Sequence, residues 1–296
     1  MNNKLERIKA YAQSRTNRQG LRRKAPVWIF PAGEQRKYTS VLLEMVRKVN
    51  KLVEERIIAR LPQFVQRAES LRMDEWPEDM DDEFIWLNTQ ADAFIAAAQA
   101  ILPEIGEGVG IFNNTQFRQL MRSTIGVDVF AAEPWLESQL KSWASENSAL
   151  IKSVPKQELD KIQAMAQRGV RSGASAGDIA KEIRAQFGVT ESRARLISLD
   201  QISKLNADLT QQRQESIGIT KYTWSSSRDE RTRASHRAMQ GKLCRWDDAS
   251  VYSDDGGKTW KKRSSIGGVQ LHPGRDYQCR CNGTADTESL LTELGI

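Results

Sequence analysis

The chain has 296 residues, of which 39% are hydrophobic and 28% are charged. This length is enough for two domains of about 100–200 residues each, and the composition favours a multi-part soluble protein over one compact, core-rich enzyme. No stretch approaches roughly 18 uninterrupted apolar residues, so we expect no transmembrane helix, and Met1–Lys9 lacks the apolar run of a signal peptide. Three cysteines do not make a disulfide framework, which indicates synthesis in a reducing cytosol.

The net charge of +6 is concentrated at the N-terminus. Between Met1 and Lys37 there are ten basic residues and two acidic ones, a net +8. Basic arms of this kind neutralise phosphates, although a solvated tail or docking on an acidic protein surface would have the same composition. We therefore predict a basic arm over residues 1–35 whose contacts are to nucleic acid or to a protein partner. The candidate residues are Arg15, Arg18, Arg22, Arg23 and Lys24, followed by the apolar anchors Trp28, Ile29 and Phe30 between two prolines.

The middle of the chain, residues 36–155, reads as a helical region. Apolar residues recur at three- and four-residue steps over residues 36–60 and 82–101, which predicts two amphipathic helices separated by an acidic linker. Helix signals weaken between Gly106 and Pro134, where glycine recurs, and another helix is expected beyond Pro134. We interpret these helices as scaffold that contacts other proteins.

Residues 156–217 predict three further helices. The first is broken at Gly169–Gly173. The second has a capping-box-like start at Ser175–Asp178, with Asp178 in place of Glu at the fourth position, and stops at Gly188. The third is capped by Thr190, ends at Gly218 and leads into a strand at residues 219–224. The predicted fold class is therefore α+β: a long, mainly helical N-terminal part, then a helical lead-in and a small β-containing module over residues 218–285 within a C-terminal domain of residues 156–296.

The two histidines and three cysteines of the chain all fall in this last module. His236, His272, Cys279 and Cys281, with Cys244 spare, predict a mixed His/Cys site for a structural zinc ion. The Cys-x-Cys spacing argues partly against it, because on one strand the two side chains would have to converge. The alternatives are buried packing of the thiols and Cys/His catalysis, which would need an orienting carboxylate such as Asp229 or Asp276.

The segment Tyr252–Trp260 carries Asp-Gly turn chemistry and predicts a hairpin with Trp260 over the turn. It also matches the repeated Asp-box of sialidase-like propellers. A propeller needs this unit several times, and it occurs here once. We therefore expect a hairpin insertion and not a glycosidase.

The order and spacing of several residues resemble the phage head morphogenesis family, the Mu protein F-like minor head proteins. The resemblance covers roughly Ser172–Gly283 and closes with His272-Pro273 and Cys279-Arg-Cys281. Two departures stand out: the segment Ile197–Ser203 lacks the family's usual glutamate, and the spacer 274–278 is slightly long. The signature residues are Trp224, Asp229, Arg231, Arg233, His236 and Gly241.

This resemblance implies a minor capsid protein of a tailed bacteriophage and implies no catalysis. Such a protein is made in the host cytoplasm and resides in the virion head near the portal, with no membrane involved during assembly. Its partners are the portal protein or the major capsid protein, and its roles are head assembly and DNA packaging or ejection. One alternative is a DNA-contacting protein packaged inside the head through its basic arm; a third is a metal- or Cys/His-dependent enzyme.

Overall fold

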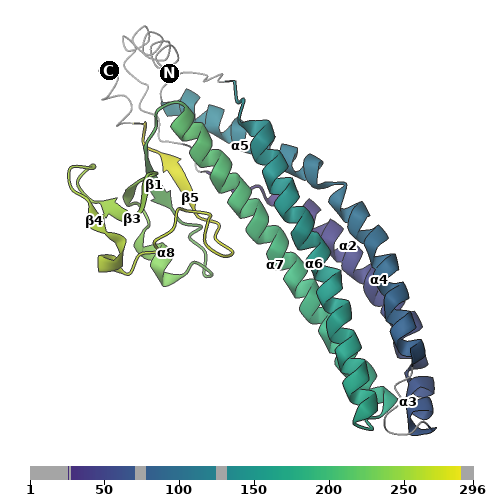
Figure 1. The fold of residues 1–296 in the computed structure, drawn as a ribbon. Helices are drawn as coiled ribbons and strands as arrows, with labels where there is room; N and C mark the ends of the chain where they lie inside the picture. Colours follow the sequence, from purple (N-terminus) through teal and green to yellow (C-terminus); the bar gives the residue numbers. More distant parts are fainter. Residues whose placement is uncertain (1–25, 27, 71–77, 125–131, 288–296) are drawn as a thin grey trace. The chain divides into compact units, whose positions relative to one another are not determined.

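The computed structural model describes residues 26, 28–70, 78–124 and 132–287 (Figure 1). The chain divides into two compact units. We call residues 33–106 and 139–199 the helical unit, and residues 1–32, 107–138 and 200–296 the mixed unit. The α+β fold class is confirmed, whereas the predicted domain boundaries after residues 35 and 155 stay a prediction.

The described helices are α2 (Ala32–Arg56), α3 (Leu61–Ser70), α4 (Glu78–Gln99), α5 (Leu102–Thr124), α6 (Leu136–Arg171), α7 (Ala176–Ser216) and α8 (Ala234–Ala238), with short 3-10 turns at Ile58–Arg60 and Arg263–Ile266. The described strands are β1 (Lys221–Ser225), β2 (Leu243–Arg245), β3 (Asp248–Ser253), β4 (Lys261–Lys262) and β5 (Asn282–Ala285).

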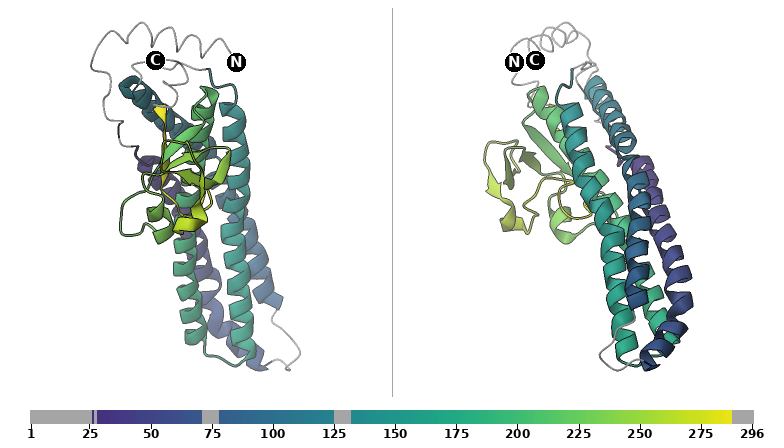
Figure 2. Two further views of the ribbon diagram at one scale, coloured as in Figure 1. Left: turned by 90° about the vertical axis from the view of Figure 1, so that its left-hand side faces the viewer. Right: turned by 45° about the vertical axis from the view of Figure 1, so that its right-hand side comes forward.

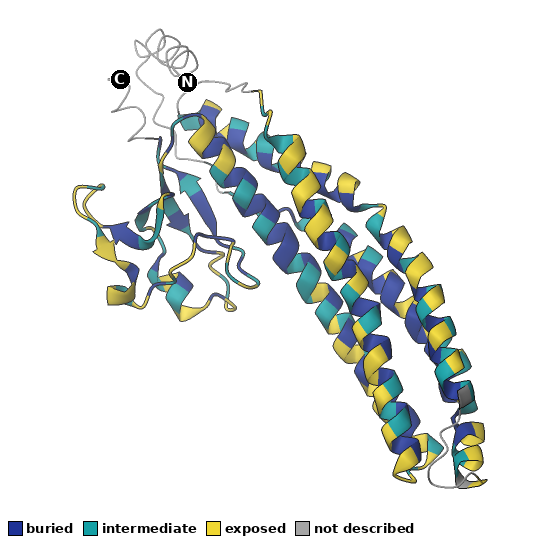
Figure 3. Cartoon of the chain, viewed as in Figure 1, coloured by how far each residue is buried: buried dark blue, intermediate teal, exposed yellow. Residues whose placement is uncertain are grey.

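In the helical unit, α2, α4, α6 and α7 run alongside one another (Figure 2). Buried residues follow one face of each helix and exposed residues the other (Figure 3), as the spacing of apolar residues predicts. The core of this unit includes Val53, Phe84, Leu159 and Ile183, each with at most 1% of its surface exposed. Burying each such side chain contributes about 1.5–3 kcal/mol, so this shared core holds the four helices together.

Two helix boundaries predicted from the sequence, at Gly188 and Thr190, are wrong. Gly188 does not stop a helix, and Thr190 does not cap one, because α7 is continuous from Ala176 to Ser216. The Thr190 hydroxyl instead donates back to the Gln186 carbonyl at 3.2 Å, as a mid-helix threonine does. A helical glycine costs only about 0.5–1 kcal/mol, less than the burial of one large apolar side chain such as Ile183.

The N-cap half of the capping-box-like start is confirmed at the start of α7. The Asp178 amide donates to the Ser175 hydroxyl oxygen at 3.1 Å, and that hydroxyl donates to the Asp178 carboxylate at 2.7 Å. The predicted break is also present, since α6 ends at Arg171 and Gly173 has φ +71°. However, α6 begins at Leu136, so the helices expected beyond Pro134 and after Lys156 are one helix.

The stretch after Gly106, where helix signals in the sequence are weak, belongs to the long helix α5. A Cβ atom at Gly106 would lie 3.4 Å from the Trp143 ring, so glycine there permits close packing and does not mark a loop. By length and composition alone, the stretch Asp79–Thr124 is apolar enough to contain a membrane span. The core helix of a water-soluble protein passes the same test, and the α4 residues Phe84, Leu87 and Ala91 are buried in the core of the helical unit.

The mixed unit contains a five-stranded antiparallel sheet in the order β4-β3-β2-β1-β5. The predicted strand at 219–224 is β1, and the predicted hairpin joins β3 to β4. In the hairpin, the Asp255 carboxylate accepts hydrogen bonds from the Ser253 hydroxyl at 2.6 Å and from the Thr259 amide at 2.9 Å. Cys279 and Cys281 do not lie on one strand, the arrangement considered above for their spacing, because β5 begins at Asn282 and both cysteines lie in the preceding loop.

Candidate functional site

A cluster of His236, Cys279 and Cys281 lies in the mixed unit, and we call it the His-Cys cluster. His236 comes from α8, directly after the turn that follows β1, and the cysteines come from the loop that precedes β5. One ligand atom from each residue lies within 4.8 Å of the other two. The His236 Nδ1 atom is 3.4 Å from the Sγ atoms of both Cys279 and Cys281. All three residues are buried, so the atoms face one another and not solvent.

The other ring nitrogen of His236 is bound to a carboxylate. Nε2 lies 2.8 Å from Asp276 Oδ2, and the same oxygen accepts a hydrogen bond from Arg233 Nη1 at 2.6 Å. When Nε2 carries the proton that Asp276 accepts, Nδ1 presents its lone pair to the two sulfurs. Arg233 and Asp276 therefore fix the orientation of the imidazole.

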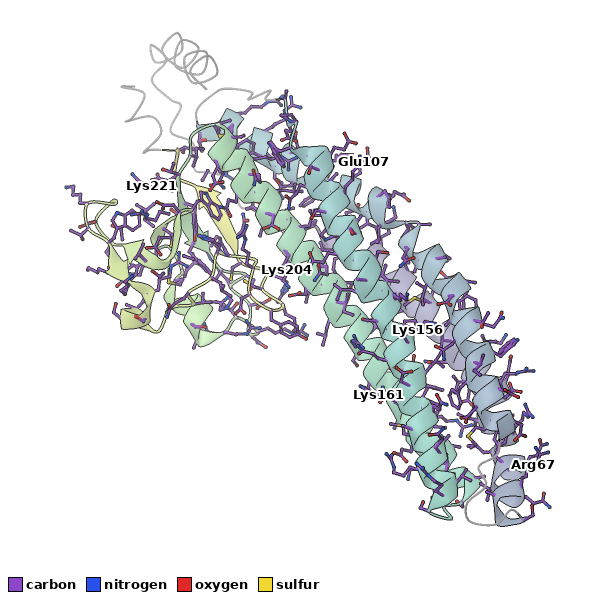
Figure 4. All side chains as sticks on the ribbon, viewed as in Figure 1. Arg67, Glu107, Lys156, Lys161, Lys204 and Lys221 are labelled. Carbon is purple, nitrogen blue, oxygen red and sulfur yellow. The ribbon has the colours of Figure 1, made fainter. Side chains whose placement is uncertain are left out.

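The loop that carries the cysteines is held against the C-terminal part of α7. The Gln278 amide donates to Asp200 Oδ1 at 3.0 Å, and Arg275 pairs with Asp208 at 2.7 Å. Lys204, on the same helix, pairs with the other oxygen of Asp200 at 2.7 Å (Figure 4). At Gly274, φ is +84° and a Cβ atom would lie 2.6 Å from the side chain of Ala207. Glycine at this position therefore permits both the turn and the close approach to α7.

Hydrogen-bond donors surround the Cys279 sulfur. The backbone amides of Gly274 and Cys281 donate to Sγ at 3.3 and 3.4 Å. The hydrogen bond from the Cys281 thiol is the largest influence on Cys279, and with the contacts to His236 and the amides it lowers the pKa of Cys279. The pKa of Cys281 is raised because it supplies that hydrogen bond and is buried. The contact with Cys279, and then that with Asp276, raises the pKa of His236.

His272 and Cys244 lie outside the His-Cys cluster. The His272 Nδ1 atom is 2.9 Å from the hydroxyl of Tyr222, its ring lies beside that of Trp246, and burial lowers its pKa to about 4. Cys244 is buried on β2. Of the four ligands that the sequence predicts, the structure thus brings three together; whether they bind metal stays a prediction.

The apolar anchors of the predicted arm lie beside this loop. Trp28, Ile29 and Phe30 line a small pocket of about 20 Å³ together with Ser203, Asn206 and residues 279–282. The Ile29 amide donates to Gln116 Oε1 at 2.8 Å, and Gln116 Nε2 donates to the Ile29 carbonyl at 3.0 Å. The basic candidates Arg15, Arg18, Arg22, Arg23 and Lys24 lie outside the described residues.

The signature residues build the framework of this site. Trp224 is fully buried on β1, and its carbonyl accepts the amide of Gly241, which has φ +75°. Asp229 accepts hydrogen bonds from Thr232 and Arg280, which ties the turn before α8 to the cysteine loop. Arg231 is exposed. Sequence reasoning missed that α7 holds the cysteine loop, because the contacts of Asp200 and Asp208 join residues more than 60 positions apart and leave no local pattern.

A nucleophilic role for Cys279 has the required residue types, since a thiol, an imidazole and the Asp276 carboxylate are in contact. Substrate access does not support it. The Cys279 side chain is buried, and the adjoining pocket of about 20 Å³ is far smaller than the ~300–1,000 Å³ of ordinary ligand pockets.

Comparison with known proteins agrees with the predicted resemblance. Residues 160–284 match the family described as Phage Mu protein F like protein. An uncharacterized protein of Haemophilus influenzae strain Rd is 34% identical over 172 residues, which is 57% of this chain and 35% of the relative. The chain thus spans about a third of the length of the curated relative that it matches. No solved structure matches the chain.

The matched region contains α7, α8, the cysteine loop and the sheet except for the last residue of β5, Ala285. The resemblance predicted from the sequence is confirmed over this region. Residues 160–284, less than half of the chain, are therefore similar to the Phage Mu protein F like family.

Proposed function

We propose that the protein is a minor head protein of a tailed phage, which acts by binding the portal protein or the major capsid protein during head assembly. The observation that carries this proposal is the family match over residues 160–284. The exposed apolar side chain of Ile29, with 56% of its surface accessible, supports the N-terminal anchor as a contact point. A portal-proximal location in the virion and a part in DNA packaging or ejection belong to the same proposal.

The test is direct binding to purified portal and major capsid proteins of the parent phage, measured by sedimentation at low and high salt. We expect binding to one of them that persists at high salt, because apolar contacts are not screened. The Ile29→Asp variant should weaken binding at least tenfold. Ile111→Asp is the matched control, since Ile111 is also in the mixed unit and is 62% exposed. No binding to either partner, or equal weakening by both variants, would count against the anchor.

The second candidate function is contact with packaged DNA, favoured by the net +8 of residues 1–37. Neutralising several phosphates makes the affinity fall steeply with salt. A change of all five basic candidates, Arg15, Arg18, Arg22, Arg23 and Lys24, to Ala should then abolish DNA binding and leave portal binding in place. DNA binding that survives this change would refute the role of the arm.

We propose a structural role for any metal held by the His-Cys cluster, with zinc as the ion. Support comes from the burial of all three residues and from the small size of the adjoining pocket. A catalytic metal would need room for a substrate at its open position.

A further inference from the structure

We propose that His236, Cys279 and Cys281 form a three-ligand site for one divalent ion of the zinc class, through Nδ1 and two thiolate sulfurs. Zinc bonds are about 2.0–2.1 Å to nitrogen and 2.3 Å to sulfur. In a tetrahedron with these bonds, the nitrogen–sulfur edge is about 3.6 Å. Both observed Nδ1···Sγ distances are 3.4 Å. Both distances are thus within a few tenths of an ångström of this edge, and the two sulfurs lie within 4.8 Å of each other. This site is independent of the proposed head-assembly function.

The groups around the three ligands are arranged as in a metal site. Asp276 Oδ2 lies 2.8 Å from the imidazole nitrogen that faces away from the sulfurs, and a carboxylate in this position is one of the usual partners of a zinc-bound histidine. The amides of Gly274 and Cys281 donate to the Cys279 sulfur, which suits a sulfur that carries negative charge. The loop geometry that allows these contacts depends on Gly274 at positive φ.

The donor set selects the class of ion. Two thiolates and one imidazole are soft or borderline ligands, which favour zinc over magnesium or calcium, whose preferred ligands are oxygens. The positive charge also offsets the cost of placing two thiolates in a buried site. Without an ion, the two sulfurs can share a proton but cannot both be ionised at low cost.

The fourth coordination position has no protein ligand among the described residues, because no fourth His, Cys, Asp or Glu joins this group. Cys279 and Cys281 both line the pocket of about 20 Å³ beneath Trp28–Phe30, and about 10–15 Å³ of such volume is enough for one water. Trp28 and Asn282 also line this pocket, and the Trp28 Nε1 and Asn282 Nδ2 atoms have no hydrogen-bond partner among the described residues. We assign the fourth position to a water molecule in this pocket.

The test uses the full chain, purified under reducing conditions. We expect about one zinc per chain by elemental analysis. After exchange for cobalt(II), we expect the visible bands of a tetrahedral site and the near-ultraviolet charge transfer of two thiolates. Cys279→Ser and Cys281→Ser should each lose the bound zinc, and His236→Gln should lose it or bind it at least tenfold more weakly. His272→Gln and Cys244→Ser are the matched controls and should retain one zinc per chain.

Circular dichroism separates loss of metal from loss of fold. A wild-type chain that is folded yet takes up no zinc or cobalt would overturn the proposal. Loss of zinc from a folded His272→Gln variant would overturn the three-ligand assignment in favour of a fourth ligand from His272. If a cysteine variant fails to fold, the cobalt spectrum of the wild-type chain still decides the proposal, because absence of thiolate charge transfer refutes it.

Discussion

Glu158 on α6 is a carboxyl group placed inside the core of the helical unit. Only 1% of its surface is exposed, and the side-chain amide of Asn50, oriented to satisfy its hydrogen bonds, donates to Oε1 at 3.0 Å. Burial is the main reason that its pKa rises from 4.5 to about 8. The nearby Glu191 adds to the rise, whereas the Thr190 hydrogen bond and Lys161, one turn along α6 (Figure 4), oppose it. We therefore expect a neutral Glu158 in the folded protein at neutral pH.

The sign of the pH dependence follows from linkage. In the unfolded chain the group ionises near pH 4.5, and in the folded chain it ionises near pH 8. The contribution of the protonated Glu158 to the stability of the fold is thus fully present below about pH 4.5 and is lost as the pH rises to about 8. At about 1.4 kcal/mol per pKa unit, the loss over this window is on the order of 5 kcal/mol.

Glu158→Gln removes the ionisation and keeps a group of the same shape. At pH 5 the variant should match the wild type within about 1 kcal/mol, and at pH 8 it should be more stable by several kcal/mol. Because the two units need not unfold together, we would measure hydrogen exchange of the α6 amides at pH 5, 6, 7 and 8. Asp160→Asn is the control, since Asp160 lies on the same helix but is exposed. An unchanged loss of α6 protection between pH 5 and 8 in Glu158→Gln would refute the reasoning.

Three further predictions concern other parts of the chain. Gly188→Ala should stabilise α7 by about 0.5–1 kcal/mol, because no described atom beyond the adjacent backbone of α7 lies within 4 Å of the added Cβ; an amide-exchange measurement that shows a loss of protection would contradict this. Glu133→Ala leaves Arg213, which is 1% exposed and bound to Glu133 at 2.6 and 2.8 Å, without its carboxylate partner. The variant should be destabilised by about 3–5 kcal/mol, measured by denaturant melts, and a change below 1 kcal/mol would contradict the expectation. Asp276→Asn should weaken zinc binding by about 10–100-fold without abolishing it, and a competition titration that gives wild-type affinity would exclude a positioning role.

The sequence predicts local features of this fold well. It fails where contacts between residues far apart in the chain determine the structure. The N-cap at Ser175 and the Asp255 hairpin depend on residues two to four positions apart, so their patterns are visible in the sequence. Gly188 has the same local appearance as a helix stop. Whether the helix continues through Gly188 depends on the buried side chains that precede and follow it on α7, such as Ile183 and Ile202. The local sequence does not show which residues these side chains pack against.

The candidate site follows the same division. The sequence identifies the rare histidines and cysteines as candidate ligands, but it does not distinguish His236 from His272. Burial does not distinguish them either, because both are buried in the mixed unit. What separates them is the partner of each ring: the Tyr222 hydroxyl for His272, and two sulfurs and a carboxylate for His236. The expected difficulty with Cys-x-Cys spacing also disappears, because the cysteines lie in a loop and not on a strand.

The continuity of α7 has a direct consequence for the site. Asp200 and Asp208 are eight residues apart on one helix, which separates them by about 12 Å along the helix axis and by about 80° around it. Asp208 holds Arg275 and Asp200 holds the amide of Gln278, so the cysteine loop is fixed to one rigid element at two points. Gln278 has φ +52°, a conformation that costs a non-glycine residue about 1–2 kcal/mol. The hydrogen bond to Asp200 offsets that cost, and the residue it holds directly precedes Cys279. The position of the Cys279 sulfur beside His236 therefore depends on α7 as well as on the loop that carries it.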